Sequence, residues 1–519
     1  MSKNSRLFQC NVILLFLFCF SNIVFAYEEL EILKNKVVKL EERLNDIQQA
    51  RMKAYWKNGF QIKYNDPASS NEYRFRFRTG IQFRYTFVDT DDNIFYNGAP
   101  TGKNIAHTEN FSSFNIRRLR FYVDGTAPTP AWKYFVHLQL EPQGGVNAHD
   151  SFIQWQEFKA FRIQFGRMKI PALGIEYWQS GFGQNGTDRT IFTGDSECDK
   201  DLFGCATYDF PGSNSRLRVG NHRLENGFST GGFLLYRSQG LNINGYLDLL
   251  DKKDFFTYWL GIYNGRDTRG SANVDDQMLY TCRFGMNFLP GSDPKGPMGP
   301  NALNNYTSQG DYAFNTKPLG AFITSAFWDK DQTPTLYGIS NNSTDGFMKT
   351  LMEIHDIANY GYSAALLFRY LGFSADLEYA MERFKQKGAD HEAWDRLGFR
   401  LNLGYFILPE KWELTAKLAY VERLKNNNLE DSIKSGLGLV KLADGFVIED
   451  NLQQFILGVN YYLHGFNQYI TADLCLNQRK FKEVSSSAAL AMGLATEAFS
   501  GHADNQDDLR VRVMYQFLF

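Results

Sequence analysis

Residues 73–87 read YRFRFRTGIQFRYTF. The odd positions of this stretch carry mostly aromatic or aliphatic side chains, and the even positions carry Arg74, Arg76, Arg78 and Arg84 with no acid. Side chains of a β-strand point to alternate faces, so the stretch predicts a strand with one apolar and one cationic face. Its 15 residues are many for a soluble strand and are typical of a tilted strand that crosses a membrane.

The same period of two recurs along the chain. Alternating or strand-like runs lie at 118–124, 132–141, 149–158, 161–165, 230–248, 256–264, 278–289, 319–328, 361–382, 393–422, 452–478 and 509–519. Short connections lie at 126–130, 408–411 and 464–467. Long connections lie at 89–112, 171–200, 290–317, 328–360, 423–451 and 478–506. Short turns at one end and long loops at the other are typical of outer-membrane barrels. We therefore expect an all-β fold over residues 56–519: a closed antiparallel transmembrane β-barrel of about 16 to 18 strands, without sheet edges.

The N-terminal residues differ from this pattern. Residues 1–26 combine a positive start, an apolar run over 12–20 and small residues at the end, which predicts a secretory signal peptide. In residues 27–55, apolar side chains are spaced alternately three and four apart from Leu30 to Ile47. This heptad spacing predicts a short coiled-coil helix that joins copies of the chain, with a homotrimer as the expected state. The alternative is an amphipathic helix that lies on its own protein.

Export permits disulfides, and Cys198 with Cys205 is the candidate pair in a polar loop; two free thiols are the alternative. The formal net charge of −2 over 519 residues gives no reason to expect a nucleic-acid partner. The G-x-G-x-x-G spacing at Gly181, Gly183 and Gly186 has no strand before it and no helical pattern after it, so no cofactor is expected. No metal-ligand or nucleophile–base grouping stands out, and we expect no metal site and no enzyme.

The cationic phase carries the functional prediction. On the strands quoted above, the phase predicted to face the lumen carries ten cations and four acids. Arginines two apart on a strand are about 6.6 Å apart, and their repulsion is about 0.6 kcal/mol in water but about 2.5 kcal/mol at an effective dielectric near 20. Such a face is favoured beside water, so we expect a channel wall that attracts anions. The alternative is that the arginines pair with acids of neighbouring strands and stiffen the wall. The predicted pore-lining residues are Arg74, Arg76, Arg78, Arg84, Arg118, Arg120, Lys133 and Arg162.

Several short segments, in order over residues 60–519, resemble the phosphate-selective porin O and P family of outer-membrane channels. They are FNIRRLR at 114–120, IQFGRMKIP at 163–171 followed by Glu176, Asp188-Arg189, LGIYNG at 260–265, GYFILP at 404–409, LGVNYY at 457–462 and YQFLF at 515–519. The resemblance implies a sixteen-stranded trimeric porin with an arginine-lined lumen and lysines at an anion site. It places Arg117, Arg118 and Arg120 on the arginine-rich strand and makes 171–200 the loop that constricts the pore. This loop holds five acids, a departure from the family's phosphate site: Asp188, Asp195, Glu197, Asp199 and Asp201.

We therefore expect a barrel in the outer membrane of a Gram-negative-type bacterium, in contact with lipid, that passes small anions passively, with phosphate as one candidate. A non-selective diffusion porin and a surface adhesin or antigen are the alternatives.

Overall fold

The computed structural model describes residues 31–41, 52–65, 71–90, 111–140, 146–193, 233, 237–249, 252–264, 278–289, 306–330, 357–386, 394–422, 439–442, 445–482 and 506–519. Residues 31–41 form a helix inside the predicted heptad segment. Its apolar side chains, among them Leu33 and Leu40, are exposed. None of the helices in the described ranges is both long and apolar enough to span a bilayer.

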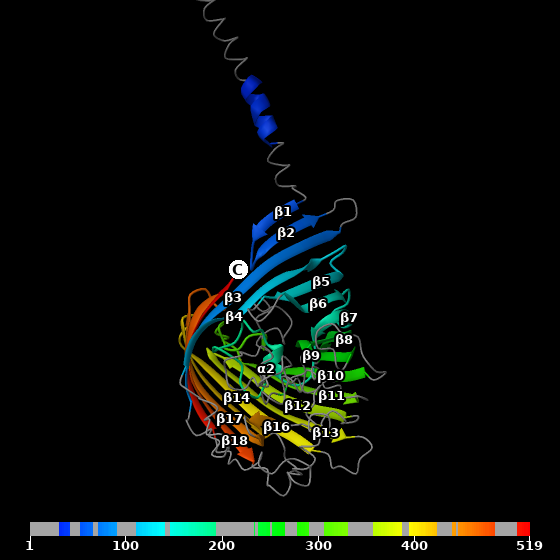
Figure 1. Cartoon of the computed structure of the whole chain (residues 1–519). Helices are drawn as coiled ribbons and strands as arrows, with labels where there is room; N and C mark the ends of the chain where they lie inside the picture. The colour runs from blue at the N-terminus through cyan, green and yellow to red at the C-terminus, as the bar shows by residue number, and fades with distance from the viewer. Residues whose placement is uncertain are drawn as a thin grey trace, which may run out of the picture.

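Sixteen strands form a closed antiparallel ring in which each strand pairs with the next, and the last strand pairs with the first (Figure 1). Of the 19 strands in the described ranges, three lie outside this ring: β1 (Met52–Trp56), β2 (Phe60–Asn65) and β16 (Leu439–Leu442). The predicted closed barrel is confirmed. The ring strands are β3 (Glu72–Thr90), β4 (Phe111–Thr126), β5 (Trp132–Gln139), β6 (Asn147–Trp155), β7 (Arg162–Lys169), β8 (Arg237–Leu249), β9 (Lys252–Asn264), β10 (Met278–Leu289), β11 (Leu319–Lys330), β12 (Ile357–Tyr370), β13 (Phe373–Gln386), β14 (Trp394–Leu408), β15 (Trp412–Glu422), β17 (Gly445–Tyr462), β18 (Gln468–Lys482) and β19 (Gln506–Leu518).

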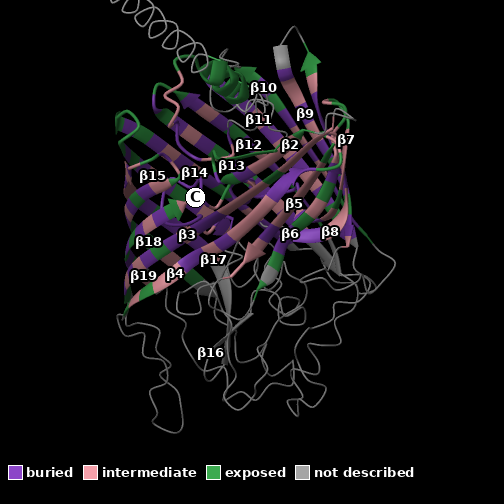
Figure 2. Cartoon of the chain, turned by 90° about the horizontal axis from the view of Figure 1, so that it is seen from above, coloured by how far each residue is buried: buried purple, intermediate pink, exposed green. Residues whose placement is uncertain are grey.

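Burial alternates along the strands (Figure 2). On β13 the outward side chains Leu377 and Tyr379 are 44% and 39% exposed, whereas the inward carboxylates Asp376 and Glu378 are at most 1% exposed. An apolar outer surface around a polar interior is favoured in lipid and unfavourable in water. The chain is therefore a membrane-spanning barrel of the outer-membrane type.

The two ends of the barrel have connections of different length. Short turns join β8 to β9, β12 to β13 and β14 to β15 at one end, which is the periplasmic end in barrels of this type. The connection 290–318 between β10 and β11 also starts and finishes at this end. The alternation of short and long connections predicted only short turns there, so this long one is a correction.

A hairpin precedes the ring. β1 pairs with β2 through a three-residue turn at residues 57–59, in which Asn58 and Gly59 have positive φ (50° and 109°). The segment predicted as helix over 27–55 thus contains strand from Met52 onward. The five residues of β1 are too few to show a period, and their pairing with β2 decides their conformation.

The edge of β3 is shared by two partners. Residues 72–77 pair with β2, and residues 80–90 pair with β19. Between them, the backbone of Thr79 exchanges two hydrogen bonds with the terminal residue, Phe519, at 2.7 and 2.8 Å. The C-terminus therefore completes the closure of the ring.

Candidate functional site

After β7 the chain turns into the barrel as an inner loop, residues 170–193. Gly174 has a φ of 53°, which L-residues rarely adopt, and the short helix α2 (Ile175–Trp178) follows it. Figure 1 shows α2 inside the ring. The backbone N–H of Ile175 donates to Glu378 of β13 at 2.8 Å. The first half of the inner loop is thus fixed to the β13 wall.

The second half of the inner loop is fixed elsewhere on the ring. Thr187 donates from its backbone nitrogen and from Oγ1 to Asp473 of β18, at 3.1 and 2.6 Å. Gln516 of β19 donates to the carbonyl of Phe182 at 2.9 Å. The loop therefore crosses the lumen, and the expectation that the loop at 171–200 folds inward is confirmed as far as the described residues reach.

Glu176 connects the parts of the inner loop. Its Oε2 accepts hydrogen bonds from the backbone nitrogen and hydroxyl of Thr190, at 3.0 and 2.6 Å, and from the hydroxyl of Thr193 at 2.8 Å. Lys417 Nζ of β15 lies 3.9 Å from Oε1. Burial alone would raise the pKa of Glu176, but the positive charges of Arg400 and Lys417 outweigh it and lower this pKa to about 2.

Acidification should loosen the inner loop through Glu176. Because its pKa is lower in the folded protein, its stabilising contribution is complete above its ordinary value of about 4.3 and is lost as the pH falls towards 2. We expect the single-channel conductance of the wild type to change within that window. Glu176→Gln should show the altered conductance already at neutral pH, and an acid-dependent change as large as that of the wild type would contradict this role.

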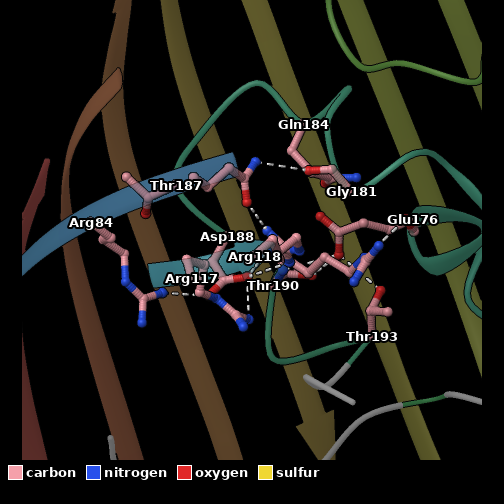
Figure 3. A network of polar contacts seen from close by, with 12 residues as sticks. Arg84, Arg117, Arg118, Glu176, Gly181, Gln184, Thr187, Asp188, Thr190 and Thr193 are labelled. Atoms are coloured by element: carbon pink, nitrogen blue, oxygen red, sulfur yellow. Dashed lines mark hydrogen bonds and ion pairs between the residues drawn. The ribbon is translucent and has the colours of Figure 1, made fainter. Parts of the chain in front are cut away.

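Asp188 of the inner loop binds arginines of β3 and β4 (Figure 3). Its Oδ2 accepts from Arg84 Nη1 at 2.9 Å. Arg117 grips the same carboxylate with both ends of its guanidinium, from Nε to Oδ2 and from Nη2 to Oδ1, each at 3.0 Å. Arg118 Nη2 lies 3.4 Å from Oδ1. We term Arg84, Arg117 and Arg118 the arginine cage; all three side chains are buried.

The neighbouring positive charges keep the Asp188 carboxylate inside the arginine cage ionised. Burial alone would raise the pKa of Asp188, but Arg117, Arg118 and Arg84 outweigh burial and hold this pKa well below its ordinary value. Asp188 is therefore an anion held among cations.

A β-bulge brings Arg117 into the lumen. Gln82 of β3 pairs with Arg118 and Phe83 pairs with Ile116, so Arg117 is an extra residue in β4. A strict period of two points Arg117 towards lipid. The alternation rule therefore missed it, although the family resemblance placed it on the arginine-rich strand.

The predicted cations near the periplasmic end of β3 have an acid partner. Asp124 of β4 lies in register with Arg76 and accepts from its Nη2 at 2.7 Å; Arg78 Nη2 donates to the other oxygen at 3.1 Å. No acid lies between these arginines along β3, but Asp124 of the neighbouring strand contacts both of them. Arg76 and Arg78 therefore match the alternative prediction, in which arginines of the wall pair with acids of neighbouring strands.

The other predicted pore-lining residues lie on the inward phase but apart from the arginine cage. Arg120 Nη1 lies 3.4 Å from Nε2 of His137, whose Nδ1 is 2.8 Å from Asp150. Arg162 stacks over the ring of Tyr246, with 4.8 Å between its Cζ and the ring centroid. Two further cations lie near the periplasmic end of their strands: Arg74 and Lys133.

On the wall built by β12–β14, three described arginines pair inward with three acids. Each pair joins an arginine to an Asp or Glu of the neighbouring strand, and all six side chains are at most 2% exposed: Arg369–Asp376, Arg400–Glu378 and Arg396–Glu382. Sequence reasoning did not single out these arginines, since strand neighbours are not visible in a single chain.

A second segment, the inner turn at residues 306–318, enters the barrel from the periplasmic end. The carbonyl of Thr307 accepts from the backbone nitrogen of Ser180 at 2.7 Å, and the nitrogen of Gln309 donates to the carbonyl of Gly183 at 2.6 Å. The inner turn and the inner loop thus touch through their backbones.

Side chains reinforce this contact. Gln309 Nε2 donates to Glu176 Oε1 at 3.2 Å, and its Oε1 accepts from Lys417 Nζ, also at 3.2 Å. Tyr312 and Phe314 pack with aromatic side chains at the periplasmic ends of the strands. No sequence signal identified the inner turn, because it has neither a period nor a motif.

Cys198 and Cys205 lie outside the described residues. Within the described ranges, no group of three or more His, Cys, Asp or Glu side chains could hold a metal ion. The predicted absence of enzymatic activity stays a prediction.

A closed barrel of sixteen strands with an apolar exterior and a loop folded across its lumen is the architecture of a porin channel. No family model and no curated protein matches the chain. Three similar solved structures are the outer membrane channel DcaP of Acinetobacter baumannii, an anion-selective porin from Comamonas acidovorans and OprB of Pseudomonas putida. Their sequence identities to this chain are 10%, 10% and 9%, and each has a TM-score of 0.45. The matches cover 88%, 86% and 86% of this chain and 99%, 100% and 94% of those chains. Identities and TM-scores this low do not indicate which solute passes through this chain.

Proposed function

We propose that this barrel passes small anions across the outer membrane by passive diffusion, with phosphate as one candidate solute. The observation that carries the proposal is the arginine cage, in which three guanidinium groups surround one carboxylate where the inner loop meets the wall. Guanidinium groups at this point of the lumen can attract a permeating anion.

Nearer the periplasmic end of the same wall, Arg76 and Arg78 share the carboxylate of Asp124, so two cations meet one acid among the described side chains at this point. In a lumen with low-dielectric walls, such an excess concentrates anions and repels cations.

The β12–β14 wall favours the rival function, a general diffusion porin. There each inward arginine described above has its own acid, so this side of the lumen adds little net charge. A pore whose path follows this wall would discriminate weakly between ions.

The reversal potential of single wild-type channels across a potassium chloride gradient tests the proposal. A potential that reports chloride over potassium supports an anion channel. A potential near zero supports the general porin, and the absence of conductance would overturn both. Inhibition of the chloride current by phosphate at low concentration would identify phosphate as a solute that binds in the pore.

Assembly is a separate proposal. The exposed apolar side chains of the helix at 31–41 fit a coiled coil between copies of the chain, and a homotrimer is the expected state.

A further inference from the structure

We propose that the outward face of the β1–β2 hairpin binds phospholipids of the periplasmic leaflet, with Trp56 at the depth of the lipid headgroups. The hairpin lies outside the closed ring, so this role does not depend on which solute passes through the lumen. The hairpin is then a membrane anchor beside the channel.

The register of the strands continues the lipid-facing surface of β3 onto the hairpin (Figure 1). Side chains that pair directly across antiparallel strands lie on the same face of the sheet. Phe77 lies on the outward phase of β3, pairs with Phe60 of β2 and is followed across the hairpin by Trp56 of β1. The outward face consists of three such rows, all of aromatic or aliphatic side chains: Phe77–Phe60–Trp56, Phe75–Ile62–Ala54 and Tyr73–Tyr64–Met52.

Much of this face is exposed in the part of the chain that the structure describes. Met52 and Trp56 are 66% and 62% exposed, and Phe60 is 38% exposed. The opposite face of the hairpin is polar, with the hydroxyl of Tyr55 donating to Gln61 Oε1 at 3.2 Å. Because a large exposed apolar patch is unfavourable in water, the outward face requires an apolar partner.

Trp56 also joins the hairpin to the outward surface of β19. Its indole ring stacks on the ring of Phe519, with 6.4 Å between the centroids and 15° between the planes. The ring of Phe519 in turn lies 5.1 Å from that of Phe517, on the outward phase of β19. The hairpin face is thus continuous with the lipid-facing surface at two ring strands, and this continuity favours lipid as its partner.

The tip of the hairpin fits the level of the headgroups. Membrane barrels carry aromatic girdles at both interfaces, where an apolar ring meets polar headgroups. Trp132 and Trp412 are exposed on the outer wall, each as the first residue of a strand that follows a short periplasmic turn. Trp56 likewise adjoins a turn, in which Lys57 and Asn58 are exposed.

The exposed lysine distinguishes lipid from a second copy of the chain as the partner. A lysine beside an aromatic ring can extend its ammonium group to the lipid phosphates while its methylene groups stay in the apolar layer. The core of an interface between proteins is instead depleted of charged residues. Lys57 next to Trp56 therefore favours a lipid surface.

The fluorescence of Trp56 tests the proposal. The wild type and Trp56→Phe are compared in vesicles of phosphatidylethanolamine and phosphatidylglycerol whose acyl chains are brominated near the glycerol end, because bromine quenches indole at short range. The difference between the two emission spectra is the emission of Trp56. We expect brominated lipid to remove most of this emission and iodide in the water to remove much less. The substitution leaves the ring strands unchanged, so the barrel should fold.

Trp412→Phe and Trp178→Phe are the matched controls. Trp412 is 43% exposed on the outer wall, so brominated lipid should quench its emission as strongly as that of Trp56. Trp178 belongs to α2 inside the ring and packs against Trp259, with 5.3 Å between the ring centroids. Brominated lipid should leave the emission of Trp178 unchanged.

Three results would overturn the proposal. Quenching of the Trp56 emission by iodide and not by brominated lipid would show that the hairpin stands in the water of the periplasm. Emission that neither quencher reduces would show that protein covers Trp56, as expected of a contact with a second copy of the chain. Stronger quenching by lipid brominated at the ends of the acyl chains would place Trp56 in the hydrocarbon core and refute the assigned depth.

Discussion

Replacing both Arg117 and Arg118 by glutamate should turn the channel from anion preference to cation preference. Both guanidinium groups face the inner loop and contact Asp188, and the double change alters the local charge by four units. The reversal potential of single channels across a potassium chloride gradient should change sign. The corresponding double glutamine variant should give a value between the two.

The size of the effect follows from Coulomb's law. One unit charge about 6 Å from an ion contributes about 0.7 kcal/mol in water, so four units contribute roughly 2.8 kcal/mol before screening. Physiological salt screens about half of this at that distance. Because the anion is disfavoured and the cation favoured, the permeability ratio should change by roughly one to two orders of magnitude.

Arg383→Glu is the control for this variant. Arg383 also pairs with an aspartate, but it lies on the outward phase of β13 and its side chain is 40% exposed. The reversal potential of the Arg383→Glu channel should equal that of the wild type. The barrel itself should survive in the variants because the backbone ladder of β4 does not use these side chains. A double glutamate variant that folds and keeps the wild-type potential would refute the anion channel.

The strands could be predicted from the sequence because the membrane imposes one period on each of them. Leu377 and Tyr379 face outward and Asp376 and Glu378 face inward on β13, as the period of two requires. The same rule failed at Arg117, where a bulge adds one residue to β4. A bulge has no compositional sign of its own, so a strict alternation runs through it unchanged.

The candidate site could not be predicted in full because its contacts join residues that are far apart in the sequence. Arg76 and Asp124 are 48 residues apart and become partners only through the register of β3 with β4. Asp188 was noted in the loop as an acid that departs from the family pattern, but its partners depend on where that loop settles. The one-residue β-bulge and the path of the inner loop together form the arginine cage, and neither follows from local composition.

Removing the inner turn should raise the single-channel conductance several-fold. Its backbone is hydrogen-bonded to the inner loop, with Thr307 O and Ser180 N 2.7 Å apart and Gln309 N and Gly183 O 2.6 Å apart. No ion passes between groups in such contact, so the two segments together block part of the cross-section. Conductance increases with the open cross-section that remains.

The register of the flanking strands makes this deletion feasible. Leu289 of β10 pairs with Gly320 of β11, so a short glycine-containing turn can join the strands in place of residues 290–318. Gln309→Ala is the milder companion, since it removes the side-chain contacts to Glu176 and Lys417 and leaves the backbone contacts intact. We expect a small rise in conductance for this substitution and a large one for the deletion. The reversal potential should stay close to that of the wild type in both, because the arginine cage lies on the β3–β4 wall and is retained. A folded deletion variant with wild-type conductance would show that ions cross the barrel beside the β3–β4 wall and that the inner turn braces the inner loop without narrowing the path.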